Sequence, residues 1–142
     1  MRRLFVLVLA LVILALPSAV AAGGRPFVAD LAGAQEVPPA DPDGSGTAWL
    51  TLNPGTGEVC WVIFVEDIAL PASAAHIHDA PAGVNGPVDI GLSGPDATGW
   101  ASGCTSADRD QILDIIKHPD EYYVNVHNSE YPGGAVRGQL SR

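Results

Sequence analysis

The sequence predicts an all-β protein, an antiparallel β-sandwich or barrel that carries one short helix. Apolar and polar residues alternate in about seven short segments, and this is the period of a half-buried strand. The segments are separated by turns rich in glycine and proline, of which the 142-residue chain has 16 and 12. Closely spaced turns of this kind are typical of sandwiches and barrels, and the length allows a single domain.

The first 22 residues have the layout of a signal peptide. Arg2 and Arg3 are followed by the uncharged apolar run Leu4–Leu16, and small residues suited to cleavage end at Ala22. The run is too short to span a bilayer comfortably, so we expect cleavage rather than a membrane anchor, and no membrane span in the mature form. The general secretory route and the twin-arginine route both stay open. We expect residues 23–142 to form one domain that is extracellular, periplasmic or held in the cell envelope.

The net charge of the chain limits the classes of partner that it can bind. The formal net charge is −9, and loss of residues 1–22 would remove two arginines but no acidic residue. Such an acidic domain lacks the basic face that nucleic acids require, and an anionic membrane surface would repel it. We therefore expect no nucleic acid, and the predicted partner is an unidentified extracellular or envelope ligand.

The first half of the domain predicts three strands. Residues 27–31 alternate, with Phe27 and Leu31 on one face, and residues 47–52 alternate again after a loop rich in proline, aspartate and glycine. The turn at residues 53–57 joins the second strand to a return strand at 58–65, which predicts a hairpin.

The second half adds short strands and the helix. Residues 75–78, 88–92, 122–127 and 135–140 show strand patterning. Between them, the isoleucines and Leu113 within residues 105–117 are spaced for one face of a helix, and Thr105–Asp108 resembles a capping sequence. The three tryptophans, Trp49, Trp61 and Trp100, are expected to pack in the core or on the surface rather than to form a ligand platform.

Cys60 and Cys104 are the only cysteines of the chain. Both lie in the part that we expect to be exported, where a cysteine pair usually forms a disulfide bond. No CxxC spacing supports the alternative of a metal or redox pair. We therefore predict a structural disulfide between them.

Three of the four histidines are candidate metal ligands. His76 and His78 are two apart on a predicted strand and therefore point to the same face. If the strand at 122–127 is a neighbour, His127 converges with them, and three imidazoles suit copper or zinc with a position left open for water. The alternative is a polar cluster held by hydrogen bonds, for which we single out Glu36, Asn125 and Arg137.

Three separated stretches resemble the CHRD domain, first described in chordin and common in exported bacterial proteins. They are Leu31–Pro39 (LAGAQEVPP), Ala75–Val88 with its AHIH start, and Tyr122–Leu140, which contains YYVNVHN and YPGGAVRGQL. The resemblance implies an immunoglobulin-like barrel distantly similar to copper/zinc superoxide dismutase, and no established activity.

The dismutase similarity implies that His76 and His78 correspond to a copper-ligand pair and that His127 lies near a later ligand. No histidine stands between Pro81 and Pro87, so a complete zinc subsite is missing and a two-metal dismutase is not expected. Nothing in the sequence forms a complete catalytic set. The first hypothesis is therefore a non-enzymatic binding or structural module. The alternative is a protein that binds copper or zinc through the three histidines, with redox chemistry as one role for the metal.

Overall fold

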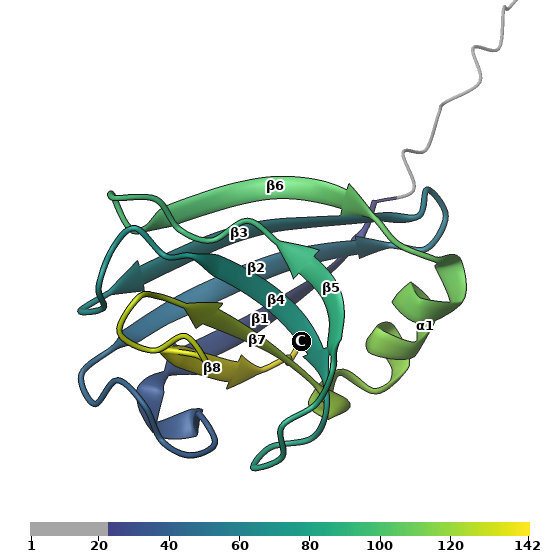
Figure 1. Ribbon diagram of the computed structural model, residues 1–142. Coiled ribbons are helices and arrows are strands. Elements are labelled where there is room, and N and C mark those ends of the chain that lie inside the picture. Colours follow the sequence, from purple (N-terminus) through teal and green to yellow (C-terminus); the bar gives the residue numbers. More distant parts are fainter. Residues whose placement is uncertain (1–22) are drawn as a thin grey trace, which may run out of the picture.

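The computed structural model describes residues 23–142, so the expected signal peptide lies outside the described residues. The chain forms one eight-stranded antiparallel sheet that curls into a nearly closed barrel (Figure 1). The strand order is β5-β4-β7-β8-β1-β2-β3-β6, which leaves β5 and β6 as the two edges. This confirms the predicted all-β class. The strands are β1 (Arg25–Ala32), β2 (Ser45–Asn53), β3 (Glu58–Glu66), β4 (Ala74–Asp79), β5 (Val88–Leu92), β6 (Trp100–Ser106), β7 (Tyr122–His127) and β8 (Val136–Gln139).

Strict alternation separates the interior of the barrel from its surface. On β2, Ala48, Leu50 and Leu52 are buried, whereas Trp49 and Thr51 between them are exposed. The hairpin predicted around residues 53–57 is present, since β2 and β3 pair in register on both sides of that turn. The same rule on the other strands fills the barrel with apolar side chains, which include Phe27, Leu31, Val59, Trp61, Ile63, Ile77, Val124 and Val126.

The helix is shorter than the sequence predicted. It was expected over residues 105–117, but α1 (Arg109–Lys117) begins four residues later because the chain up to Ser106 continues strand β6. Alternation did not reveal β6, since its residues are mostly small or polar and Ala101 is its one buried member. Two 3-10 turns, η1 (Gly33–Gln35) and η2 (Pro119–Glu121), complete the elements.

Helix α1 lies at one end of the barrel (Figure 1). Its apolar face contributes Ile112, Ile115 and Ile116 to the core, as the predicted helical spacing requires. Within residues 23–142, no helix has both the length and the apolar character needed to cross a bilayer.

The disulfide fastens the edge strand β6 to the sheet. Cys60 on β3 and Cys104 on β6 are direct cross-strand partners with Cα atoms 4.0 Å apart, and their sulfurs are bonded. The predicted pairing is confirmed, although the strand that carries Cys104 was not foreseen.

Candidate functional site

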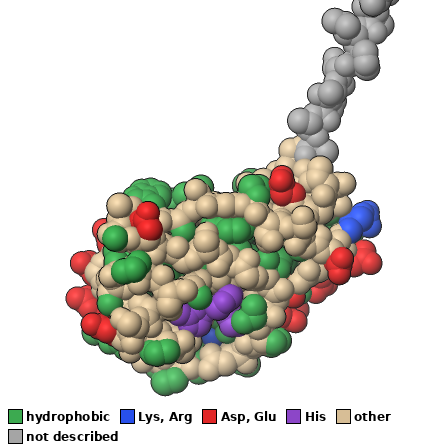
Figure 2. Space-filling view, turned by 45° about the horizontal axis from the view of Figure 1, so that its top comes forward, with side chains coloured by type: hydrophobic (Ala, Val, Ile, Leu, Met, Phe, Trp, Pro, Cys, Tyr) green, Lys and Arg blue, Asp and Glu red, His purple; other side chains and the backbone are tan. Residues whose placement is uncertain are grey.

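The three candidate histidines lie on the outer face of two paired strands. On β4 the inward residues Ala75 and Ile77 are fully buried, so His76 and His78 point outward. Strand β7 pairs with β4 and places His127 directly opposite Ala74. His127 therefore lies diagonally across from His76, whose direct partner is Asn125. Figure 2 shows histidine side chains gathered at one spot on the visible face, with acidic side chains lying toward the margins of that view.

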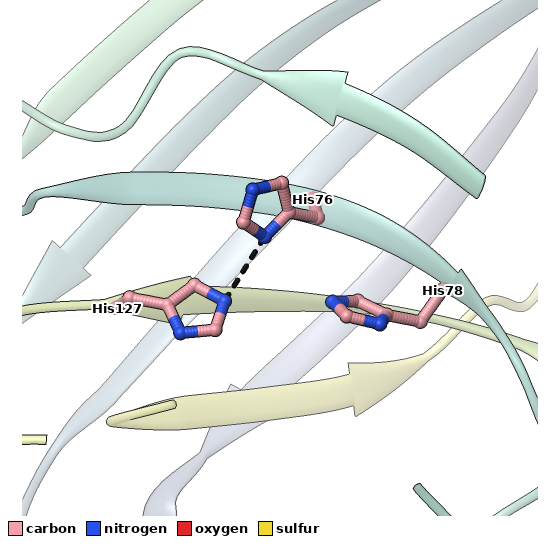
Figure 3. A group of neighbouring side chains, drawn as sticks. All are labelled: His76, His78 and His127. Atoms are coloured by element: carbon pink, nitrogen blue, oxygen red, sulfur yellow. Dashed lines mark hydrogen bonds between the residues drawn. The ribbon is translucent and has the colours of Figure 1, made fainter. Parts of the chain in front are cut away.

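The three rings, which we call the histidine trio, converge on a common point. One nitrogen from each of His76, His78 and His127 lies within 4.8 Å of the others. His76 and His127 are closest, with Nδ1 of the first 3.0 Å from Nε2 of the second (Figure 3). His78 is buried and the other two rings are half-buried, so the point of convergence is reachable from solvent.

Backbone carbonyls fix two of the rings. Nδ1 of His78 lies 3.0 Å from the carbonyl oxygen of Gly86, and Nδ1 of His127 lies 3.0 Å from that of Pro132. A carbonyl only accepts, so both Nδ1 atoms carry the proton and both Nε2 atoms present a lone pair. This arrangement, in which a ligand imidazole donates its other N–H to a fixed acceptor, is the usual outer support of a metal-bound histidine.

The loop that holds His78 depends on a glycine. A Cβ atom at Gly86 would lie 2.0 Å from the carbonyl oxygen of Asp79, so a larger residue there would push the loop away from β4. Only glycine allows the loop to lie this close to the strand. The carbonyl of Gly86 thereby reaches His78.

Among the ring nitrogens of the trio, Nδ1 of His76 is placed to donate to Nε2 of His127, and no donor of the described residues reaches Nε2 of His78. Nε2 of His127 lies 3.0 Å from Nδ1 of His76 and also 3.0 Å from Oδ1 of Asn125, which can only accept. Nε2 of His78 is buried and has no hydrogen-bond partner among the described residues. Several acceptor atoms therefore face one small space, which favours a cation there.

The surroundings of His76 and His127 favour the neutral form of these two imidazoles. Burial lowers the pKa of His76, and the nearby rings of His127 and His78 lower it further. Burial also lowers the pKa of His127, against the opposing effect of its hydrogen bond to Pro132 and with a smaller contribution from His78. Neutral imidazole is the form that binds a metal.

The polar residues predicted around the trio lie next to it on the same outward face of the sheet, and loops cover them. Asn125 pairs with His76 on one side and with Arg137 of β8 on the other, so the three residues form one cross-strand row. Asn125 and Arg137 are almost fully buried, as is Glu36 at the end of η1. The structure thus places all three in one cluster, covered by loops rather than open to solvent.

Arg137 ties this cluster to the loop above it. Its Nη2 donates to the carbonyl of Pro81 at 3.0 Å and to Oε1 of Gln139 at 3.1 Å, and its guanidinium lies 3.4 Å from the centroid of the Tyr123 ring. The ring of His78 stacks on the same tyrosine, with centroids 4.7 Å apart and planes 4° from parallel. Arg137 and His78 are therefore linked through Tyr123.

Glu36 is a buried acid with an incomplete set of partners. Burial raises its pKa, whereas the positive charge of Arg137 and hydrogen bonds from the Val37 backbone and the Asn125 side chain lower it. One of its oxygens, Oε1, is buried without a hydrogen-bond partner among the described residues. Its contact with Asn125 turns that amide so that Oδ1 faces His127.

Sequence reasoning missed Tyr123 and Gln139. Both share the outward face with residues that it did find, since Tyr123 has the parity of Asn125 and His127, and Gln139 that of Arg137. Parity along the strand was therefore the available signal. The carbonyl contributions of Gly86 and Pro132 had no signal in side-chain type.

The fourth histidine and the cysteines lie outside this site. His118 ends α1, as expected. Glu58 lies close to Cys60 and Cys104, but the two sulfurs are bonded to each other and offer no thiolate to a metal.

Comparison with known proteins assigns the chain to a family. The family model of the CHRD domain matches residues 27–140, nearly all of the described chain. No curated protein and no solved structure matches, so the similarity to superoxide dismutase stays a prediction. The three stretches that resembled the family lie on β1 with η1, on β4 with the loop after it, and on β7 with β8, and these elements build the histidine site. The chain belongs to the CHRD domain family.

Proposed function

We propose that this CHRD domain is an exported, non-enzymatic binding module whose histidine trio holds one transition-metal ion, with copper preferred over zinc. The single observation that carries the proposal is the convergence of three ring nitrogens within 4.8 Å of one another. The disulfide supports export, because such bonds persist in oxidising compartments.

The positions of the nitrogens favour copper. With metal–nitrogen bonds of about 2.05 Å, two nitrogens 3.0 Å apart subtend an angle of about 95° at the ion. That angle is nearer to the right angles of a tetragonal Cu²⁺ site than to the tetrahedral angle that Zn²⁺ adopts. Imidazole sites also bind Cu²⁺ more tightly than Zn²⁺ by the general order of divalent-metal affinities.

The test is the metal content of the purified protein. After removal of metal with a chelator, one equivalent of copper is added in competition with zinc, and native mass spectrometry gives the stoichiometry. We expect one copper ion per chain. The double variant His76→Ala, His78→Ala should lose it, and His118→Ala, which removes a histidine outside the trio, should keep it. Absence of bound metal at micromolar concentrations, or full retention by the double variant, would contradict the proposal.

A second candidate is a binding surface that uses no metal. The direct hydrogen bond between His76 and His127 and the network around Arg137 favour it, because they hold the polar cluster together without an ion. In that case the surface around the histidine trio contacts an extracellular or envelope ligand through the half-buried rings of His76 and His127. The same variants then weaken ligand capture while the metal content of the wild-type protein is zero, which separates the two candidates.

A further inference from the structure

A second surface with no assigned role lies on the outside of the barrel, on strands β2, β3 and β6, which β8 and β1 separate from the strands of the histidine trio. The outward residues of β2, β3 and β6 include four large apolar side chains, which we call the aromatic face: Trp49, Val62, Phe64 and Trp100. Trp49 is 46% exposed and Trp100 is 48% exposed, whereas Trp61 points inward and is buried. The expectation of packing residues therefore holds for the buried Trp61 and for Trp100, which lies against Phe64, but about half of Trp100 and of Trp49 stays exposed.

We propose that the aromatic face binds a neutral polysaccharide chain, with the indoles of Trp49 and Trp100 as stacking platforms and the groups around them as hydrogen-bond partners.

The register of the strands sets the spacing of the two indoles. Trp49 is opposite Val62, and Trp100 is opposite Phe64, which is two residues further along β3. Two strand spacings and two residues of rise separate the Cα atoms of the tryptophans by about 12 Å. A short oligosaccharide spans this length, so one chain can contact both indoles.

The Trp100 ring is held in place before any ligand arrives. The ring of Phe64 lies against it with centroids 4.6 Å apart. Such a pair is favourable beyond the area it buries, and a ring already fixed loses less freedom on binding. One face of the pair stays exposed as a stacking surface.

Two hollows adjoin the indoles and share Val62. The larger, about 520 Å³, lies at the open seam between β6 and the end of β5, and Asp96, Trp100 and Ser102 help to line it. The smaller, about 140 Å³, lies beside Trp49 and Thr51. A sugar presents apolar C–H faces and a rim of hydroxyls, and this combination of indole, hydroxyl and carboxylate matches it.

Asp96 is prepared to accept hydrogen bonds from hydroxyls. The backbone N–H and the hydroxyl of Thr98 both donate to its Oδ1, at 2.7 and 2.5 Å. These hydrogen bonds lower the pKa of Asp96, so it is a carboxylate at neutral pH. A carboxylate forms stronger hydrogen bonds to hydroxyl donors than a neutral acceptor does.

The charge of the face selects a neutral partner. On β3 the outward residues between Glu58 and Glu66 are uncharged, although the chain as a whole has a net charge of −9. An anionic polymer would be repelled by the net negative charge of the protein, and the single carboxylate at the edge of the face, Asp96, is already engaged by Thr98. A neutral chain is not repelled, and its hydroxyls can donate to the remaining oxygen of Asp96.

The experiment is affinity electrophoresis in gels that contain xylan, mannan or mixed-linkage β-glucan, together with sedimentation with insoluble cellulose and chitin. We expect at least one of these neutral polymers to retain the protein. The double variant Trp49→Ala, Trp100→Ala should bind it at least about tenfold more weakly. The double variant Val84→Ala, Val88→Ala, which removes exposed apolar side chains elsewhere, should bind normally.

A second measurement does not depend on the folding of a variant. N-bromosuccinimide should oxidise Trp49 and Trp100 and spare the buried Trp61, and the retained polysaccharide should protect both exposed indoles. Binding should also survive His76→Ala, His78→Ala, so a failure of the metal proposal leaves this one intact. The proposal is overturned if no neutral polymer retains the protein, if the tryptophan variant is retained equally, or if that variant instead converts a dimer into a monomer.

Discussion

Replacement of Arg137 by methionine should destabilise the domain by about 3 kcal/mol. The side chain is 1% exposed. It donates hydrogen bonds to Pro81 and Gln139, each contributing about 1.5 kcal/mol for a charged donor, and a longer one of 3.5 Å to Asn85 that adds little. Its contact with the Tyr123 ring adds about 2 kcal/mol. Burial lowers the pKa of Arg137, which marks the cost of desolvating the guanidinium, and methionine recovers part of that cost while keeping the apolar stem.

The same substitution should couple to Glu36. The positive charge of Arg137 favours the ionised form of this buried acid, whose pKa is raised by burial. Without Arg137 the carboxylate loses that favourable contact, so Glu36→Gln should be less harmful, or even stabilising, in the Arg137→Met background. We expect a coupling free energy of about 1 kcal/mol or more between the two positions at pH 7.

The assay is urea unfolding of the wild type, both single variants and the double variant, with the disulfide intact and the pH varied from 4 to 7. A raised pKa means that the ionised form of Glu36 is disfavoured in the folded state. The stability of the wild type relative to Glu36→Gln should therefore fall as the pH rises through this range. A loss below about 1 kcal/mol for Arg137→Met, or additivity within about 0.5 kcal/mol, would refute the role assigned to Arg137.

Three further predictions concern the metal and the disulfide. Copper at one hundred times its dissociation constant should raise the melting temperature by about 10 °C, in the wild type and in His118→Ala but not in His78→Ala, as differential scanning fluorimetry would show. Copper affinity measured by competition with a chelator should be constant near neutral pH and fall only below the ordinary imidazole value of about 6.5, because the pKa values of His76 and His127 are lowered and protons compete only beneath them. A decline already at pH 7.5 would contradict this. Cys60→Ala with Cys104→Ala should lower the free energy of unfolding by about 4 kcal/mol, because the bond closes a loop of 44 residues, and an unchanged urea midpoint would count against it.

Alternation in the sequence predicted the faces of the strands, and through them most of the site. The outward direction of His76 and His78 follows from the period of a strand alone. The approach of His127 does not, because it depends on the pairing of β4 with β7, which are separated by β5, β6 and α1 in the chain. Local pattern carries no information on which distant strands become neighbours.

Burial of the polar cluster was beyond the reach of the sequence for a related reason. Asn125 and Arg137 have the parity of surface residues, yet both are almost fully buried because loops lie over that face. The position of the loop after β4 depends on the close approach of Gly86 to the backbone of Asp79. Strand β6 was missed because its residues are mostly small or polar and so show little hydrophobic alternation.

The architecture separates stability from binding at most positions. Inward side chains form the core, while the histidine trio and the aromatic face lie on outward positions of different strands, with β8 and β1 between β7 and β2. Changes at Trp49, Trp100 or His76 should therefore alter binding with little loss of stability. Asn125 and Arg137 are exceptions, because they are outward by strand parity but buried by the loops, and Arg137 joins the fold to the histidine site. The small effect expected at the first three positions and the large effect at Arg137 follow from the same geometry.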